Sequence, residues 1–449
     1  MEKEIKNLNC KEYFYWLKDI FEKNDAGYQY IIDKKGKAAY NLHNEIFLKN
    51  INNNESLEEC VDKLIDWLLF FRREHLSLRG DESKPNFLDI DIESFKKYIE
   101  EKEKVDYEGV WVIGGSKIEI GIKKINSKYI GFIIKTDDKN WQPKEIKLVI
   151  DSENDSAIYY SSNHYKSRSQ IKKFNKDLFK IRFFYLIRKN AKFNSLTDNY
   201  IKRITATKPY FERIDDNILY LRIPSFNANS KKDIDKVILK NKELILKTKN
   251  LIIDLRDNGG GADSSYSELL PLIYTNPIRN INEEILSTKL NNENFINVLK
   301  RFDFPEEIKD KIIKMYNKLE EHTDQFINAN DSDIEIITYP QVHKYPENVA
   351  IMINEGNGST GEQFILNSKQ SKKVKLYGRS TAGVLDISNM VADVVSPDKK
   401  MIFSYSISKS LRIPNMSIDG VGIQPDYYID ESIPYNEWLQ FVVNNLKNF

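Results

Sequence analysis

Two short stretches of this sequence hold residue types whose spacing could do chemistry. The first, residues 250–261, reads NLIIDLRDNGGG, an apolar run followed by three glycines. Glycines after a buried strand allow positive φ and bring bare N–H groups close to a ligand. Such groups could bind a phosphate or the oxyanion of an acyl-transfer intermediate. Because the spacing fits neither common nucleotide-binding glycine motif, nucleotide binding is the weaker reading, and a tight turn without a ligand is the other alternative.

The second stretch, residues 349–368, reads VAIMINEGNGSTGEQFILNS and has the same strand, glycine turn and helix pattern. Ser359 opens the helix, where the positive end of the helix dipole stabilises negative charge beside its hydroxyl. The alternative is an S-x-x-E capping box formed by Ser359 and Glu362. If the two strands are neighbours, the glycine amides and the Ser359 hydroxyl converge. That arrangement is a nucleophile beside preorganised N–H donors, as acyl transfer requires.

Four segments in the second half of the chain carry a family resemblance. They are DLRDNGGG at 254–261, N-x-x-x-x-S-x-x-E-x-F at 354–364, GRSTAG at 378–383 and DGVGIQPD at 419–426. In this order and spacing they resemble the serine peptidase family that includes the C-terminal processing (tail-specific) proteases, the tricorn core protease and the retinoid-binding repeats of the retina. The resemblance implies that Ser359 is the nucleophile and that the amides of Gly260 and Thr360 form the oxyanion hole.

The general base departs from the tail-specific pattern, in which a lysine follows the T-x-G motif. This chain has Val384 at that position, so a Ser–Lys dyad there is excluded. The tricorn-like branch uses a histidine from the N-terminal helical part and an acidic residue just before G-[VI]-x-P-D. By resemblance, His75 is the base and Asp419 the acid that orients its ring. An imidazole with an ordinary pKa of about 6.5 suits proton transfer at neutral pH.

The elements that must position these residues fall into three regions. Apolar residues at helical spacing predict a helical N-terminal domain over residues 1–103. Short alternating runs predict a β-rich, barrel-like module over 104–200, in which the PDZ domain common in the family is not evident. Alternating strands and helices predict an α/β peptidase core over 201–449, with a helical insertion at about 291–328. The resemblance implies a crotonase/ClpP-like form of this core.

Composition limits the possible partners of the 449-residue chain. Lys+Arg number 68 and Asp+Glu 67, so a net charge of +1 gives no general attraction to nucleic acid or to an acidic membrane. The sequence has no run of 18 apolar residues, so it predicts no membrane span. Cys10 and Cys60 lie in amphipathic helical patterns without redox or metal-ligand spacing, so we expect buried or half-buried thiols. Neither a metal nor another cofactor is expected.

The sequence therefore predicts a serine-type peptidase that acts on a peptide or protein substrate. Two alternatives stay open: a non-catalytic protein that binds a ligand or peptide on the same fold, and an esterase with the same triad. The N-terminal residues lack the basic and apolar regions of a signal peptide. We expect a cytoplasmic protein if this is the full-length chain, and a secreted or cell-surface protein if a leader has been removed.

Overall fold

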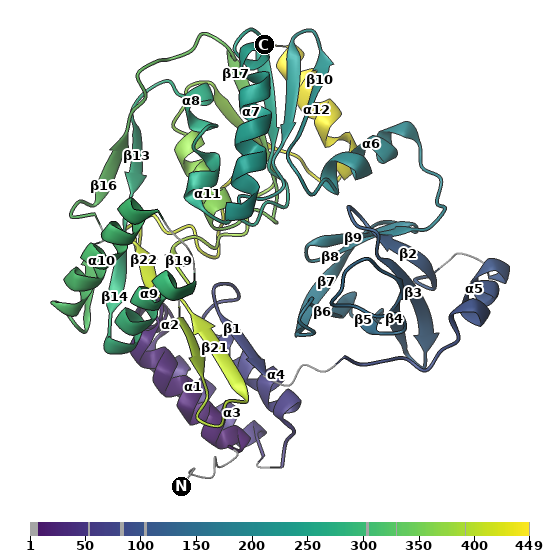
Figure 1. The fold of residues 1–449 in the computed structure, drawn as a ribbon, viewed down its shortest axis with the longest axis vertical. Helices are drawn as coiled ribbons and strands as arrows, with labels where there is room; N and C mark the ends of the chain where they lie inside the picture. Colours follow the sequence, from purple (N-terminus) through teal and green to yellow (C-terminus); the bar gives the residue numbers. More distant parts are fainter. Residues whose placement is uncertain are drawn as a thin grey trace.

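The computed structural model describes residues 8–52, 54–80, 85–102, 106–301, 305–328, 330–390 and 392–448. A bundle of N-terminal helices, a β-barrel and a layered α/β core are its three parts (Figure 1). No helix within these ranges is long and apolar enough to cross a membrane. The predicted combination of an α/β fold, a helical N-terminal region and a barrel-like module is confirmed.

The N-terminal part consists of four helices, and two of them begin at capping boxes, at Asn9 and Ser56. The amphipathic faces pack around large buried side chains such as Phe21 and Trp67, whose rings lie edge to face. The helices are α1 (Cys10–Asn24), α2 (Tyr28–Lys35), α3 (Lys37–Asn50) and α4 (Leu57–Leu68).

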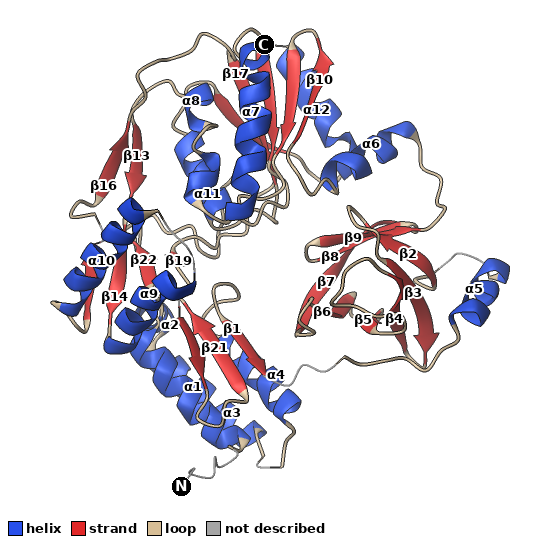
Figure 2. Cartoon of the chain, viewed as in Figure 1, coloured by secondary structure: helices blue, strands red, loops and turns tan. Residues whose placement is uncertain are grey.

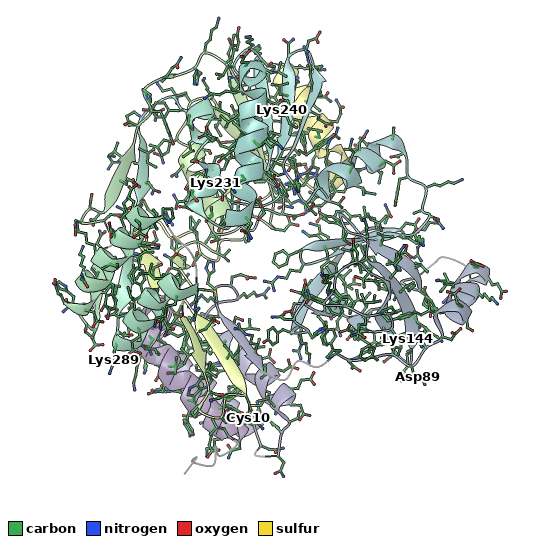
Figure 3. All side chains as sticks on the ribbon, in the orientation of Figure 1. Cys10, Asp89, Lys144, Lys231, Lys240 and Lys289 are labelled. Atoms are coloured by element: carbon green, nitrogen blue, oxygen red, sulfur yellow. A yellow bond between two sulfur atoms is a disulfide. The ribbon has the colours of Figure 1, made fainter. Side chains whose placement is uncertain are left out.

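A disulfide joins Cys10, at the start of α1, to Cys60 in α4. Cys10 lies among the N-terminal helices (Figure 3). The expectation of two thiols is therefore wrong. Each cysteine was correctly expected on the apolar face of its helix, but the sequence did not reveal that these faces pack together. Their Cα atoms are 5.5 Å apart, which is within the range that a disulfide spans.

The barrel is closed by eight antiparallel strands, each paired with its neighbours in chain order. Its interior is filled by apolar side chains such as Trp111 and Leu148, both almost fully buried. Helix α5 (Ile92–Glu101), which the sequence analysis groups with the N-terminal helices, packs through Phe95 against Phe132 of the barrel. The strands are β2 (Gly109–Ile113), β3 (Glu119–Ile125), β4 (Lys128–Lys135), β5 (Ile146–Asp151), β6 (Ser156–Tyr160), β7 (Lys166–Asn175), β8 (Leu178–Ile181) and β9 (Phe184–Arg188).

The α/β core is built on a six-stranded sheet in the order β10-β11-β12-β17-β18-β23. All neighbouring pairs are parallel except β10 with β11. Asp254 pairs with Met352, so the glycine turn after β12 and the serine turn after β17 leave the same edge of the sheet. The strands are β10 (Tyr210–Asp215), β11 (Ile218–Arg222), β12 (Asn250–Asp254), β17 (Asn348–Ile353), β18 (Val374–Gly378) and β23 (Tyr427–Tyr428).

Helices cover both faces of this sheet (Figure 2). Helices α7 (Lys231–Ile245), α8 (Leu270–Ile273) and α11 (Thr360–Ser368) pack on one face, and α12 (Trp438–Lys447) packs on the other. Helix α6 (Ser195–Ile204) links the barrel to the core. A 3₁₀ turn, η2 (Asp263–Tyr266), precedes α8. Pro271, the second residue of α8, has no N–H to donate the hydrogen bond that would join the two elements.

Smaller sheets connect the core to the N-terminal helices. In one of them, Ser77 of β1 pairs with Ser404 of β21, which attaches the segment after α4 to the C-terminal half of the chain. The elements are β1 (Ser77–Gly80), β13 (Ile278–Ile281), β14 (Glu283–Ser287), α9 (Lys289–Arg301), α10 (Glu306–Glu320), β15 (Gln325–Asn328), β16 (Ile334–Ile337), β19 (Ile387–Ser388), β20 (Ala392–Val395), β21 (Met401–Tyr405) and β22 (Ser408–Ser410), with 3₁₀ turns η1 (Ala228–Ser230) and η3 (Tyr435–Glu437).

Candidate active site

Ser359 lies at the sharp turn between the buried strand β17 and helix α11. Its backbone has a φ of 52° and a ψ of −129°, which residues with a side chain rarely adopt. Such strain is typical of nucleophiles that project from a strand-to-helix turn. Within the described chain the Ser359 side chain makes no capping hydrogen bond. The capping-box alternative is therefore wrong, and Glu362 binds the amides of Gly383 and Val384 instead.

The glycine run after β12 lies directly against the Ser359 turn. A Cβ atom on Gly260 would lie 2.8 Å from the Thr360 nitrogen and 2.9 Å from the Ser359 Cβ, so only glycine permits this approach. The Gly260 amide donates to Oδ1 of Asn258 at 3.0 Å. This corrects the expectation that Gly260 supplies an oxyanion donor, because its single N–H is already engaged. The sequence could not distinguish three adjacent glycines by their amide directions.

Two other amides remain available beside Ser359, those of Gly261 and Thr360. Both residues line the same cavity as Ser359. Neither amide has a hydrogen-bond partner in the described part of the molecule. The Thr360 hydroxyl donates to the Gly261 carbonyl at 3.1 Å, which ties the two turns together. Fixed, unpaired N–H groups beside a serine can stabilise the oxyanion of a tetrahedral intermediate.

His75 and Ser359 line one cavity of about 630 Å³, although they come from opposite ends of the chain. His75 follows α4 and precedes β1, and the pairing of β1 with β21 brings it to the core. No hydrogen bond joins the imidazole to the Ser359 hydroxyl among the described contacts. Catalytic hydrogen bonds are often long before substrate binds, so sharing the cavity is compatible with a base and its nucleophile.

The tautomer of His75 follows from its hydrogen bond. Nδ1 lies 2.6 Å from the carbonyl oxygen of Ile387, which can only accept. Nδ1 therefore carries the proton, and Nε2 is left with a free lone pair. Burial lowers the pKa of His75, although the hydrogen bond to Ile387 opposes this shift. The ring is thus held neutral at neutral pH, in the state that a general base requires.

Asp419 does not make the expected hydrogen bond to His75. Its carboxylate instead accepts the amides of Leu385 at 2.7 Å, Asp386 at 2.7 Å and Ile387 at 3.1 Å. Burial, and then the neighbouring Asp386, raises the pKa of Asp419 to about 6. The expectation of a direct triad contact is corrected by this geometry, because the Ile387 carbonyl occupies the position of the acid.

Three further residues support the site and were not predicted to belong to it. Glu362 was considered only as a capping partner, although its S-x-x-E spacing was visible. Asp386 forms a buried ion pair at 2.8 Å with Arg412, which lines the cavity. Nothing in the local sequence marks either of them, because their pairing depends on chain segments that meet only in the fold.

Acidic side chains contribute much of the charge at the cavity. Asp263, Glu283 and Glu335 line it together with Arg412. Burial raises the pKa of Glu283. Because the charge of Arg412 is offset by Asp386, the cavity as a whole favours positive charge and hydrogen-bond donors.

A strained serine at a helix N-terminus, two unpaired amides and a neutral imidazole in one cavity define a serine hydrolase site. Residues 217–429 match the sequence profile of Peptidase family S41. No curated protein sequence matches the chain significantly. Residues 217–429 belong to peptidase family S41, as the four motifs predicted, and the chain is a serine peptidase.

Solved structures with similar folds share little sequence with this chain. Mature CPAF complexed with lactacystin has a TM-score of 0.56 and 12% identity, covering 97% of each chain. Mature CPAF alone has a TM-score of 0.52 and 12% identity, covering 97% of this chain and 95% of that one. The photosystem II D1 C-terminal processing protease has a TM-score of 0.41 and 12% identity, covering 96% and 95%. The two CPAF likenesses show the same fold across nearly the whole chain.

Proposed function

We propose that this peptidase cleaves peptide bonds through an acyl-enzyme on Ser359, with His75 as general base. The observation that carries the proposal is the strained Ser359 turn, which lines the same cavity as His75. The unpaired amides of Gly261 and Thr360 support the proposal, because they can form the oxyanion hole in place of the expected pair of Gly260 and Thr360.

In this mechanism Nε2 of His75 takes the proton of Ser359 Oγ as that oxygen attacks the substrate carbonyl carbon. The carbonyl π electrons move onto oxygen, where the amides of Gly261 and Thr360 stabilise the negative charge. Collapse of the tetrahedral intermediate breaks the C–N bond, and the imidazolium gives its proton to the leaving amine. Water then attacks the acyl-enzyme by the same route, releasing the acid product and restoring Ser359.

The substrate of this mechanism is a peptide or protein segment. The carboxylates of Asp263, Glu283 and Glu335 support a substrate that brings cationic or donor groups into the cavity. The presence of both a hydroxyl nucleophile and a base argues against a protein that only binds a ligand. The esterase alternative differs from a peptidase only in its substrates.

We also propose that the protein works in an oxidising compartment, outside the cytosol or on the cell surface. The Cys10–Cys60 disulfide supports this, because disulfides persist in oxidising surroundings and are rare in the cytosol. Protein isolated from its native source without reductant should contain no free thiol, and two thiols after reduction. Two free thiols before reduction would reject the proposal.

Ser359→Ala should remove peptide hydrolysis, with a loss of kcat on the order of 10⁶-fold if the site works as a unit. Stability should change little, because the hydroxyl makes no capping bond in the described structure. The measurements are kcat on a cleaved peptide, unfolding temperature and labelling by a fluorophosphonate probe. Ser264→Ala, at an exposed serine near the glycine run, is the matched control and should keep activity and labelling.

Wild-type turnover in Ser359→Ala would reject Ser359 as the nucleophile. Hydrolysis of esters without any cleavage of peptides by the parent would favour the esterase alternative. Absence of both activities and of probe labelling in the parent would favour the non-catalytic alternative.

A further inference from the structure

The segment between β18 and β19 connects the nucleophile to the base. Ile387, the first residue of β19 at the end of this segment, provides the carbonyl that fixes the His75 ring. We propose that Asp419 and Glu362 are positioning residues that hold residues 383–387 by their backbone amides, so that a main-chain carbonyl orients the catalytic imidazole. The inference rests on the proposed function of Ser359 and His75 and assigns two carboxylates a role in it.

Asp419 holds the end of the segment nearest His75. Its Oδ1 accepts the amides of Leu385 and Asp386, and its Oδ2 accepts the amide of Ile387 at 3.1 Å. On the other side, Ile387 and Ser388 form β19, which pairs with β22. The Ile387 Cα is thus fixed through its amide and through the strand that follows. Its carbonyl is left little freedom except to face Nδ1 of His75.

Glu362 holds the beginning of the segment. Its carboxylate accepts the amides of Gly383 at 2.7 Å and Val384 at 2.9 Å, together with the Thr381 hydroxyl. Glu362 is fully buried in the first turn of α11, the helix that Ser359 opens. Helix α11, which begins at the nucleophile, therefore binds the start of the same backbone segment that orients the base at its other end. A displacement of either carboxylate changes the relative position of Ser359 and His75.

Asp386 explains why Asp419 is directed at the backbone and not at the ring. The fully buried Asp386 carboxylate accepts the Asp419 amide at 2.9 Å, the Ile418 amide at 2.6 Å and the Ser417 hydroxyl at 2.9 Å. Each aspartate thus binds the other's main chain. Arg412 balances one of the two charges through its 2.8 Å contact with Asp386.

The charged and titratable groups around Asp419 are Asp386, Glu362, Arg412 behind Asp386, and His75 beyond the Ile387 carbonyl. Burial and the charge of Asp386 raise the pKa of Asp419 to about 6. A protonated carboxyl cannot accept amides with both oxygens equally, because one of them carries a hydrogen. Protonation should therefore loosen the segment in mild acid.

Asp419→Asn changes one of the contacts between the two carboxylates and residues 383–387. The amide oxygen of asparagine can still accept Leu385 and Asp386, whereas its NH₂ group would face the Ile387 N–H. We expect kcat to fall by up to about 100-fold, the effect of a misplacement of about 1 Å, while KM changes less than twofold. Glu362→Gln should act in the same direction. The double variant should lose less than the product of the two single losses, because both act through one segment.

The matched control is Asp426→Asn. Asp426 accepts one backbone amide, that of Leu376 at 2.8 Å, but it does not bind residues 383–387. It should keep the parental kcat. The readout that a purely structural role would not change is the His75 tautomer, followed by ¹⁵N NMR of the imidazole in the substrate-free protein. Asp419→Asn should weaken the Nδ1–H signal, and Asp426→Asn should leave it unchanged.

A parental kcat and an unchanged tautomer in Asp419→Asn would overturn the inference. So would a large loss of kcat with an unchanged tautomer, because Asp419 would then act on the chemistry without positioning the ring. Should Ser359→Ala keep activity, the proposed function fails. The tautomer measurement would still decide whether the carboxylates orient His75, since it needs no turnover.

Discussion

At Ser359 the backbone holds a positive φ because the neighbouring glycine turn occupies the space around it. Gly260 itself has a φ of 101°, and its missing Cβ is what allows contact with the serine turn. The two turns therefore support each other's unfavourable conformation, which is how strain persists at functional sites.

Gly260→Ala tests this contact. The new methyl group would meet the Gly358 carbonyl at 2.7 Å and the Ser359 Cβ at 2.9 Å, so the nucleophile must move. We expect kcat to fall by at least about 10²-fold, comparable to the loss of an oxyanion donor, together with a lower unfolding temperature. Gly420→Ala is a matched control, because Gly420 also has a positive φ but an added Cβ there meets nothing within 4 Å. An unchanged kcat in Gly260→Ala would contradict the contact.

The pH dependence of kcat/KM should reflect two groups at the site. His75 must be neutral to accept a proton, and burial lowers its pKa below 6.5, so activity should persist below that pH and then fall. Asp419, with a pKa raised to about 6, titrates in the same region. On the acid side, log kcat/KM should therefore fall more steeply with decreasing pH than the titration of one group predicts. In Asp419→Asn the slope should return to that of one group. An acid limb centred well above pH 7 would argue against His75 as the base.

The four motifs and the family resemblance that they carry were enough to predict Ser359, Thr360 and His75 as candidates, and the fold brings these residues to one cavity. The partners of Gly260 and Asp419 could not be predicted, because they depend on the direction of single N–H groups. Asp419 was expected to reach the ring, yet in the fold the segment 385–387 lies between them.

Among the elements, strands β8 and β9 of the barrel reach the glycine turn of the core. Lys180 lies 2.5 Å from the carboxylate of Asp257, and the Tyr185 hydroxyl donates to it at 2.7 Å. Asn354, in the turn before Ser359, donates to the same carboxylate at 2.9 Å. Burial alone would raise the pKa of Asp257, but Lys180 and these donors hold it well below its usual range. The barrel thus helps to fix both turns of the site.

Lys180→Met should weaken this junction, because it leaves the charge of Asp257 buried without its cation. The cost should be roughly 3 kcal/mol in the free energy of unfolding, with a lower kcat. Lys189→Met removes a barrel lysine whose ion pair with Glu119 is more exposed, and it should have little effect on either quantity. Adding Asp257→Asn to Lys180→Met should recover part of the loss. Equal effects of the two lysine variants would show that the junction is unimportant.

The barrel and the α/β core could be predicted because their strands have clear alternating or continuous apolar patterns. The break between the 3₁₀ turn at 263–266 and helix α8 could have been predicted from Pro271. The packing of α5 on the barrel could not be predicted from the sequence, because Phe95 could pack against any apolar surface.

Over the whole molecule, the barrel contacts the N-terminal helices as well as the core. Lys166 of β7 lies 2.8 Å from Asp62 and 2.9 Å from Glu58 at α4. The three parts therefore contact one another in a closed arrangement, with the barrel beside the other two (Figure 1). These contacts join distant positions, so no local pattern could have predicted them.

The Cys10–Cys60 disulfide should stabilise the bundle that supports His75. For a sequence separation of 50, the chain-entropy estimate is about 4 kcal/mol. Cys60→Ser should therefore lower the unfolding temperature, and reductant should lower that of the parent but not of the variant. Differential scanning calorimetry with and without reductant measures both effects. Identical transitions in all four samples would show that the cross-link contributes nothing to stability.

The pairing of β1 with β21 also sets a time order for maturation. His75 is synthesised early, but its strand partner lies at residues 401–405 and its orienting carbonyl at Ile387. On the ribosome, His75 therefore has no place to dock until residues 387–405 have been made. In the proposed mechanism, a growing chain that already carries Ser359 cannot cut itself or its neighbours before these residues are made, so the topology delays proteolysis.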